Sequence, residues 1–449
     1  MNSLQPTLDI ATIGFAWAAF LLSLFMLPGI AMVVVGNVRQ KQQGAALSIQ
    51  ITLVGWAIFC SFFIGWWLRQ LFVPGPGITG GFGDVSRALP WSVAMGSASD
   101  GAGFAWLRFV LASWMVSALV AASLLERIRT TSVLFLTLVA SAVYAPIVGA
   151  WTSDAEGWLV RLAGSHDAFG GAAIHALAGG FALGVLHRLG PRASATTAEG
   201  HIVEVPASIP WLQALGCFLF IIGLFAFMGS FLQPLASGDS GADVVVIGAY
   251  GTSTSLSLMT TNLILALSAG LLIGSVLGRG RPHKVLAGGV AGIVSIASGS
   301  DFYHPLQSFL IAGAMTWFAF SVRSHLATRY KIDDALGTVS WHGAAGVGGV
   351  IVAGFVLWAF PSTAGADPAM INPFGNTVAA LFAFLVFGYV PGYLVARFLD
   401  YLEVLRIPLS VEIAGADLMD DLADAQATAD AAERERSLVR RGLAGQSES

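Results

Sequence analysis

The chain has 449 residues, of which 56% are apolar and 11% are charged, and its formal net charge is −4. Soluble globular proteins carry about 25% charged residues, so a chain with so few cannot cover a large surface that faces water. The composition therefore excludes a soluble enzyme, a disordered scaffold and a nucleic-acid binder, and the small net charge predicts no polyionic partner.

Apolar stretches long enough to cross a bilayer recur along the chain. A bilayer-crossing helix needs about 20 mostly apolar residues, and the eighth of the runs below is short while the seventh is long enough to include loop. In chain order the eleven runs are Ile10–Val35, Ala46–Leu68, Phe104–Leu125, Thr131–Trp151, Asp167–Leu189, Trp211–Leu232, Val244–Leu277, Val285–Gly299, Leu306–Val322, Ala335–Phe360 and Thr377–Leu399. They predict an all-α polytopic membrane protein with eleven transmembrane helices.

Basic residues alternate between the loops on the two sides of these spans. Lysine and arginine concentrate in cytoplasmic loops, which fixes the orientation. One set of loops holds Arg39, Lys41, Arg127, Arg129, Arg188, Arg192, Arg279, Arg281, Lys284, Arg323, Arg329 and Lys331, whereas the other holds Arg87, with Arg69, Arg108 and Arg161 near helix ends. With eleven spans the N-terminus lies outside and the C-terminus inside. The prediction is a membrane domain of residues 1–400 and a cytoplasmic tail of residues 401–449.

The fifth and tenth spans begin with the same pattern. Asp-Ala-Phe-Gly starts at Asp167 and leads to His175, and Asp-Ala-Leu-Gly starts at Asp334 and leads to His342. The two spans are five apart, an odd number, so they enter the membrane from opposite sides. The sequence thus predicts an inverted repeat of helices 1–5 and 6–10 plus a final helix, and such repeats place the functional site near the bilayer midplane.

The spacing within the pattern brings the two histidines towards each other. Eight residues of helix place each histidine about 12 Å from its aspartate, near the middle of a hydrocarbon core of about 30 Å. Ionisable residues there are costly and usually functional, although each histidine could instead only fix helix packing. An aspartate at a helix start is by default an N-cap, which is the interpretation favoured for Asp334; Asp167 either caps or shapes the field at an outer mouth.

Two midplane imidazoles define a limited chemistry. Neutral imidazole both donates and accepts a hydrogen bond and titrates near neutral pH, so a pair suits a small neutral solute or a proton hop. A ring of carboxylates for a hydrated metal cation is not evident. Haem ligation is the rival, but His187, which follows His175, sits beside Arg188 at the cytoplasmic end. The sequence predicts no cofactor, no metal site and no enzyme activity.

At this point the chain resembles the ammonium transporter/methylammonium permease/Rhesus family, over nearly all of residues 8–416. The twin Asp-to-His patterns are its specific motifs. Supporting segments are Pro28-Gly29-Ile30-Ala31, Glu126-Arg127, Ala291-Gly292-Ile293-Val294, Pro305 and the tail from Val411 to Asp417. The resemblance implies a homotrimer in a cell membrane, expected to be a bacterial inner membrane, with one pore in each subunit.

The resemblance also implies a function and residue roles. Ammonium is recruited at an outer vestibule and loses its proton, and ammonia crosses past His175 and His342, with Asp167 as the structural and electrostatic aspartate at the recruitment side. The alternatives are an ammonium sensor with little flux, or a channel for another small neutral molecule such as carbon dioxide. The family pattern also leaves room for a cytoplasmic regulatory protein at the C-terminal tail.

Three further residues take outer-vestibule roles by position. Trp151 ends the fourth span and is the expected vestibule aromatic, with Trp158 as a competitor, because an aromatic ring face holds a cation. Ser230 is the expected vestibule hydroxyl, and Phe227 the expected gate ring. Ordinary helix packing is the alternative for Trp151, Ser230 and Phe227.

The sequence also departs from the family pattern in three places. The sixth helix reads Leu224-Phe225-Ala226-Phe227-Met228-Gly229-Ser230 and lacks the usual asparagine. The gate phenylalanine of the third helix is missing, and Phe109 or Trp114 would substitute for it. The tail continues as Leu418-Met419-Asp420-Asp421 instead of the usual acidic-His-Gly sequence.

Overall fold

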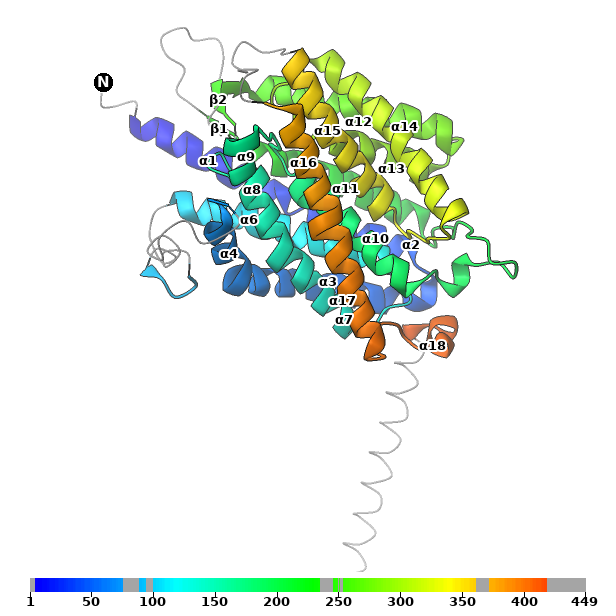
Figure 1. The fold of residues 1–449 in the computed structure, drawn as a ribbon. Coiled ribbons are helices and arrows are strands. Elements are labelled where there is room, and N and C mark those ends of the chain that lie inside the picture. The colour runs from blue at the N-terminus through cyan, green and yellow to red at the C-terminus, as the bar shows by residue number, and fades with distance from the viewer. Residues whose placement is uncertain are drawn as a thin grey trace, which may run out of the picture.

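The computed structural model describes residues 5–75, 89–93, 100–234, 245–248, 250, 253–360 and 371–417, so Arg87 and the tail beyond Asp417 lie outside the described residues. Long helices packed side by side make up nearly all of the molecule (Figure 1). They are α1 (Gln5–Ser23), α2 (Met26–Asn37), α3 (Gln43–Cys60), α4 (Trp66–Phe72), α6 (Asp100–Ser123), α7 (Thr130–Leu138), α8 (Ala145–Thr152), α9 (Trp158–Ala163), α10 (Leu177–Leu189), α11 (Pro210–Gly229), α12 (Leu256–Gly278), α13 (Pro282–Ile296), α14 (Pro305–Arg329), α15 (Ala345–Ala359), α16 (Pro373–Leu381), α17 (Val390–Tyr401) and α18 (Leu409–Ala414).

Within the described residues, ten continuous helical stretches are long and apolar enough to cross a membrane. The eighth predicted span corresponds to α13, a shorter apolar helix. Large apolar side chains on the outside of the bundle are exposed, such as Ile51, Leu272 and Val276, as a surface against lipid requires. The predicted polytopic, mostly helical membrane fold is confirmed.

The seventh predicted span begins too early. Residues Val245–Ile247 form strand β2, which pairs antiparallel with β3 (Ser253–Ser255) and with β1 (Gln233–Pro234), and the helix starts only at Leu256. The β-branched run before Gly248 is apolar enough to count as a span but has the composition of a strand. This small three-stranded sheet is a departure from a purely α-helical chain.

Several spans are interrupted rather than straight. The first run breaks into α1 and α2 around Leu24 and Phe25, because Pro28 has no amide hydrogen to donate to Leu24 and its ring crowds that carbonyl group. Others contain short π-helical segments, in which each turn holds an additional residue. These segments are η2 (Ser61–Gly65), η4 (Val139–Tyr144), η5 (Gly171–Ala176), η7 (Thr338–Ala344) and η9 (Phe382–Tyr389).

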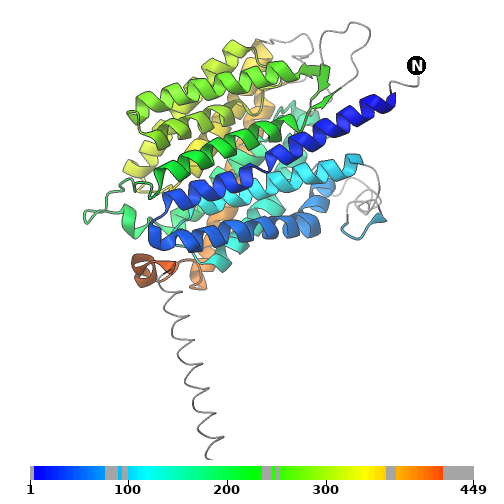
Figure 2. The same ribbon diagram turned by 180° about the vertical axis from the view of Figure 1, so that it is seen from behind.

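Small residues let the helices approach closely. Figure 2 shows α1 and α2 running alongside α11, and a β-carbon built on Gly29 of α2 would lie only 2.6 Å from the backbone nitrogen of Phe220 of α11. Close backbone approach of this kind is the usual basis of helix association in lipid, where there is no hydrophobic driving force between helices.

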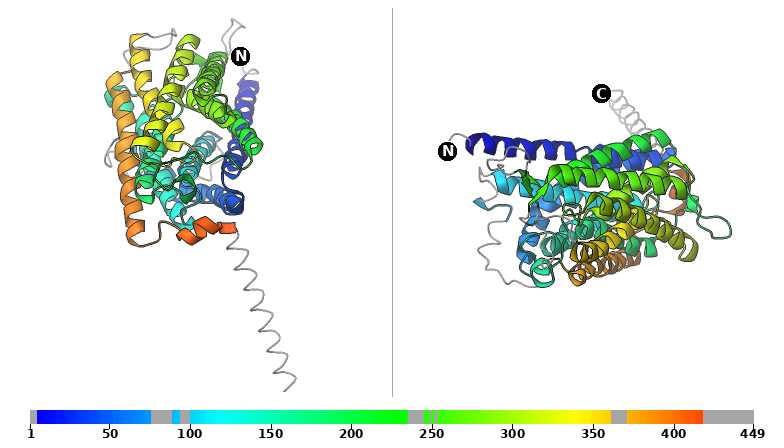
Figure 3. Two further views of the ribbon diagram at one scale, coloured as in Figure 1. Left: turned by 90° about the vertical axis from the view of Figure 1, so that its right-hand side faces the viewer. Right: turned by 90° about the horizontal axis from the view of Figure 1, so that it is seen from above.

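The two ends of the bundle differ. Basic loops gather at one end, here called the basic end, where Arg127 and Arg192 both bind Asp333. The short helix α18 lies across this end, whereas α1 begins at the opposite end (Figure 3). The three-stranded sheet is also at that opposite end, here called the sheet end (Figure 1).

The two predicted repeat helices run in opposite directions. Arg192, just after α10, binds Asp333, just before η7, so the first helix ends where the second begins. At the other end, Asn376 donates hydrogen bonds both to the carbonyl oxygen of His166, just before η5, and to that of Val350 in α15. This arrangement is the one that an inverted repeat requires.

Candidate functional site

Both predicted histidines lie in π-helical segments that begin in the same way. A glycine in the left-handed conformation precedes each segment, Gly170 with φ 84° before η5 and Gly337 with φ 81° before η7. Such a conformation is inexpensive only for glycine. The shared Asp-x-x-Gly motif therefore encodes a sharp entry into the helix, which turns the histidine towards the centre of the bundle.

Both motif aspartates cap these helix starts. Asp167 accepts hydrogen bonds from the amides of Ala172 and Ala173, at 3.0 and 3.2 Å. Asp334 accepts them from the residues five and six positions further on in the same way, at 3.3 and 3.0 Å. The carboxylates thus satisfy amide groups that would otherwise have no partner at a helix N-terminus.

Asp167 is also tied to neighbouring helices. Its side chain has no solvent exposure, and it accepts hydrogen bonds from the hydroxyls of Ser298 at 2.7 Å and Ser153 at 3.2 Å. Four donors therefore surround this carboxylate. Its position fits the capping role, and its side chain does not line the sheet-end cavity described below, although Ser153 does.

His175 and His342 meet in the centre of the bundle. Their Nδ1 atoms are 3.1 Å apart, and the ring centroids are 5.1 Å apart with the planes inclined by 25°. Both residues are buried, and the ring of Phe220 approaches His342 edge-on at 6.2 Å. One imidazole must donate and the other accept in this contact, so the pair holds one proton between the two Nδ1 atoms.

Two cavities approach this pair from the two ends of the bundle, and the basic-end cavity reaches His342. The basic-end cavity has a volume of about 810 Å³ and is lined by His342 and Trp341 at its depth. The sheet-end cavity has a volume of about 530 Å³ and extends to Ala173 and Ile174, next to His175. The histidine pair therefore lies between them, at the crossing of the two repeat helices.

The three predicted vestibule and gate residues do not line the sheet-end cavity. The indole of Trp151 donates a hydrogen bond to the carbonyl oxygen of Phe72 at 2.8 Å and packs against Trp158. The hydroxyl of Ser230 donates to the carbonyl oxygen of Phe227 at 2.6 Å, and both residues are buried. These contacts are those of packed helix ends.

Other rings take their place. The aromatic side chains that line the sheet-end cavity are Trp66, Phe109, Phe169 and Phe231. Phe109 is one of the two residues suggested for the missing gate of the third helix, while the other, Trp114, is buried outside this cavity.

Two arginines line the same cavity and were not predicted to have a role. Arg69 forms an ion pair with Asp154 at 2.6 Å, and Arg108 donates a hydrogen bond to the carbonyl oxygen of Ser230 at 2.9 Å. Both fall within continuous helices long enough to cross a membrane. An ionisable side chain inside a span is a signal of function, and this rule identifies Arg108 from sequence, whereas Arg69 follows the end of the second predicted span at Leu68.

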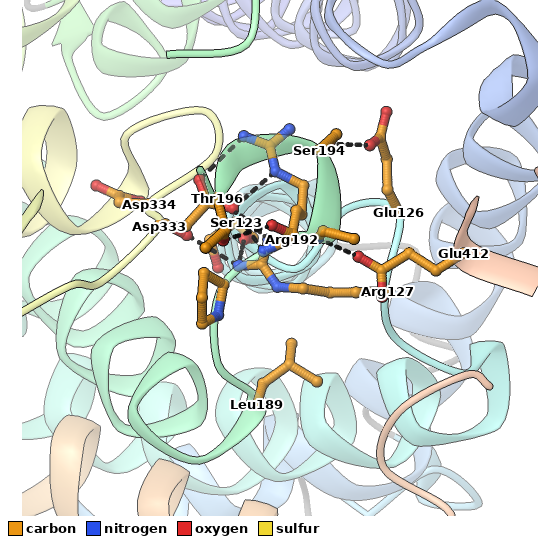
Figure 4. A network of polar contacts seen from close by, with 12 residues as sticks. Ser123, Glu126, Arg127, Leu189, Arg192, Ser194, Thr196, Asp333, Asp334 and Glu412 are labelled. Carbon is orange, nitrogen blue, oxygen red and sulfur yellow. Dashed lines mark hydrogen bonds and ion pairs between the residues drawn. The ribbon is translucent and has the colours of Figure 1, made fainter. Parts of the chain in front are cut away.

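The basic end is held by a buried ion network (Figure 4). Asp333 binds Arg127 at 2.8 Å and Arg192 at 2.7 Å. Burial opposes ionisation of Asp333, but the two guanidinium groups outweigh it and hold the pKa of this carboxyl well below its ordinary value. Arg127 is fully buried, and burial lowers its pKa to about 10, so the guanidinium still carries its charge at neutral pH.

The first part of the tail is fastened to this network. Glu412, in α18, has no solvent exposure and accepts hydrogen bonds from the amide of Ala193 at 2.7 Å and from Arg406 at 2.8 Å. Arg39 binds Glu126 at 3.0 Å and also donates to the carbonyl oxygen of Glu412. Residues 409–414 are therefore an integral part of the basic end.

Comparisons with known proteins agree with this architecture. A sequence model of the Ammonium Transporter Family matches residues 14–424. The ammonium transporter Amt2 of Methanocaldococcus jannaschii is 26% identical over 403 residues, which cover 87% of this chain and 86% of that protein. The ammonium transporter of Bacillus subtilis is 25% identical, with 90% of this chain and 95% of that protein covered.

Solved structures show the same fold. A structure titled Sensor Amt Protein superposes with a TM-score of 0.74 at 18% identity, covering 93% of this chain and 99% of that one. Mep2 of Candida albicans superposes with a TM-score of 0.70 at 19% identity, covering 90% and 88%. The chain belongs to the ammonium transporter family, a family of multi-pass membrane transporters and not of enzymes.

Proposed function

We propose that this protein transports ammonium nitrogen across a cell membrane and that ammonia, the neutral form, passes along His175 and His342. The observation that carries this proposal is the 3.1 Å contact between the two Nδ1 atoms, made by matching segments of an inverted repeat. A bare cation at the centre of a bilayer costs several kcal/mol or more, so a dry constriction passes the neutral species far more easily. Ammonia gives up its hydrogen bonds to water when it enters the constriction, and the imidazoles provide donors and acceptors that replace them.

The two cavities define the remaining path. In this proposal the sheet end faces the outside and the basic end faces the cytoplasm, as the distribution of lysine and arginine predicts. The solute enters the sheet-end cavity, crosses the histidine pair and leaves through the basic-end cavity, beside Trp341 and His342. Asp167 and Asp334 support this path indirectly, because they fix the helix starts that orient the imidazoles.

The same proposal covers assembly and location. The protein forms a homotrimer with one pathway in each subunit, in a bacterial inner membrane, with residues 1–400 as the membrane domain and residues 401–449 on the cytoplasmic side. The fastening of Glu412 to the basic end supports a coupling between the tail and the inner loops. That coupling is what a cytoplasmic regulatory protein would act on, and it also motivates the alternative of an ammonium sensor with little flux.

Transport is tested with the purified full-length chain in liposomes. Uptake of labelled methylammonium is expected to exceed that of empty liposomes, and ammonium is expected to compete with methylammonium. No signal above empty liposomes would contradict transport. A carbon dioxide flux that ammonium leaves unchanged would favour a channel for another small neutral molecule.

A further inference from the structure

The sheet-end cavity already holds a cation that belongs to the chain itself. The guanidinium carbon of Arg108, in α6, lies 5.5 Å from the ring centroid of Phe231. One of its nitrogens donates a hydrogen bond to the carbonyl oxygen of Ser230. Ser230 and Phe231 directly follow the last residue of α11, Gly229. Ser230 is the residue that the sequence predicts as the vestibule hydroxyl. A ring face that one cation covers is not available to a second.

A second arginine repeats this arrangement in the same cavity. The guanidinium carbon of Arg69 lies 5.8 Å from the ring centroid of Trp66. Its charge is matched by Asp154, whereas Arg108 has no carboxylate within ion-pair distance among the residues that the structure describes. Arg108 therefore adds a positive charge to the described lining of the cavity. This charge repels an ammonium ion that enters the cavity.

We propose that Arg108 is a specificity-determining residue, because its guanidinium covers the ring face of Phe231 in the sheet-end cavity and adds a positive charge to the cavity lining. The cavity then admits the neutral amine and excludes ammonium. This inference rests on the proposed function and deepens it, since it names the protonation state in which the substrate enters. It also replaces recruitment of the cation by Trp151 and Ser230, whose side chains are packed elsewhere.

The first experiment measures binding without transport. Purified protein in detergent is titrated with methylammonium chloride at constant ionic strength, with heat of binding and thermal unfolding as readouts. Arg108→Gln removes the charge but keeps a donor for the carbonyl oxygen of Ser230, and it is expected to bind methylammonium about tenfold more tightly than the wild type. Arg108→Lys keeps the charge and is expected to behave as the wild type.

Two further variants make the binding result decisive. Arg108→Met removes the charge with a different side chain and stands in if Arg108→Gln elutes as an aggregate. Arg161→Gln removes a charge from an exposed ion pair with Glu156 and controls for a general loss of positive charge. Equal affinity in the wild type and in both charge-removing variants would overturn the inference.

The second experiment measures flux at fixed total methylammonium and varied external pH. Wild-type uptake is expected to follow the neutral amine, which increases about tenfold per pH unit well below the amine pKa. Uptake by Arg108→Gln is expected to depend less on pH and to saturate at about tenfold lower total methylammonium.

The two experiments separate the two proposals. Tighter binding in Arg108→Gln with no flux in any variant would uphold the role of Arg108 and contradict transport. Wild-type flux that does not vary with external pH, together with unchanged saturation in Arg108→Gln, would uphold transport and overturn the role of Arg108.

Discussion

Gly179 and Gly343 touch where the two histidine-bearing helices cross, and a β-carbon built on Gly179 would lie 2.2 Å from the α-carbon of Gly343. The nearest atoms are backbone atoms of Gly343, so no flexible side chain can move to relieve the clash. We expect Gly179→Ala to push the helices apart, to lengthen the contact between His175 and His342, and to lower stability by about 1–3 kcal/mol. Methylammonium uptake should fall by about tenfold.

The matched control for that crossing is Gly55→Ala, because nothing lies within 4 Å of a β-carbon built on Gly55. Alanine in an exposed helix is expected to stabilise by about 0.5–1 kcal/mol relative to glycine. Thermal unfolding and uptake are compared for both variants. Wild-type uptake by Gly179→Ala would show that the close crossing is not needed for transport.

Replacement of either central histidine should remove the polar line through the constriction. We expect His175→Ala and His342→Ala each to reduce methylammonium uptake by at least about tenfold while the protein still elutes as a trimer. His201→Ala, in an exposed loop, is the control and should keep wild-type uptake. If both central variants conduct as the wild type does, the histidines serve only to pack the two helices.

Asp333 should make the protein sensitive to acid. Its folded-state pKa lies below the unfolded-state value of about 3.9, so the ionised carboxylate stabilises the fold at neutral pH. That stabilisation is lost as the pH falls from about 4 towards the lower folded-state pKa. Asp333→Asn leaves Arg127 and Arg192 without their partner and is expected to cost about 3–5 kcal/mol at pH 7.

The measurement for Asp333 is the melting temperature between pH 3 and pH 7. The wild type should lose stability more steeply at acid pH than Asp333→Asn, because the variant has no carboxyl to protonate. Glu156→Gln, in an exposed pair with Arg161, should change stability by no more than about 1 kcal/mol. Parallel curves for the wild type and Asp333→Asn would argue against this role.

The tail offers a test between transporter and sensor. Asp417 accepts hydrogen bonds from the amides of Gly44 and Ala45, both at 2.8 Å, in the first turn of α3. A chain that ends after Asp417 keeps these contacts and is expected to retain full uptake. A chain that ends after Ala414 loses the cap and should be less stable by about 1 kcal/mol. Loss of uptake from the first truncation would instead favour a role of residues 418–449 in activity.

The histidine core could be predicted from sequence because its determinants are local. The spacing from Asp167 to His175 recurs from Asp334 to His342, and each motif carries its own glycine and its own cap. A repeat of this kind fixes both the depth of each imidazole and the direction of each helix. The 3.1 Å contact of their Nδ1 atoms then follows from the inverted topology.

The sheet-end cavity could not be predicted in this way, because its lining depends on contacts between distant segments. Arg108 reaches Phe231 from another helix, and no local pattern in α6 indicates that partner. Trp151 ends its span as expected, but its indole donates a hydrogen bond to the carbonyl group of Phe72 and does not line the cavity. The strand at Val245–Ile247 was missed because an apolar run alone does not distinguish strand from helix.

The π-helical segments at both histidines have a consequence for the evolution of this chain. An α-helix rotates by about 100° per residue, and a π turn accommodates one residue more than an α turn. Deleting one residue from η5 or η7 would restore a regular helix and rotate everything before the deletion by about a quarter of a turn relative to everything after it. Most substitutions preserve this angular register, but a one-residue deletion cannot. We therefore expect deletions of a single residue in η5 or η7 to be rarer among functional homologues than substitutions at the same positions.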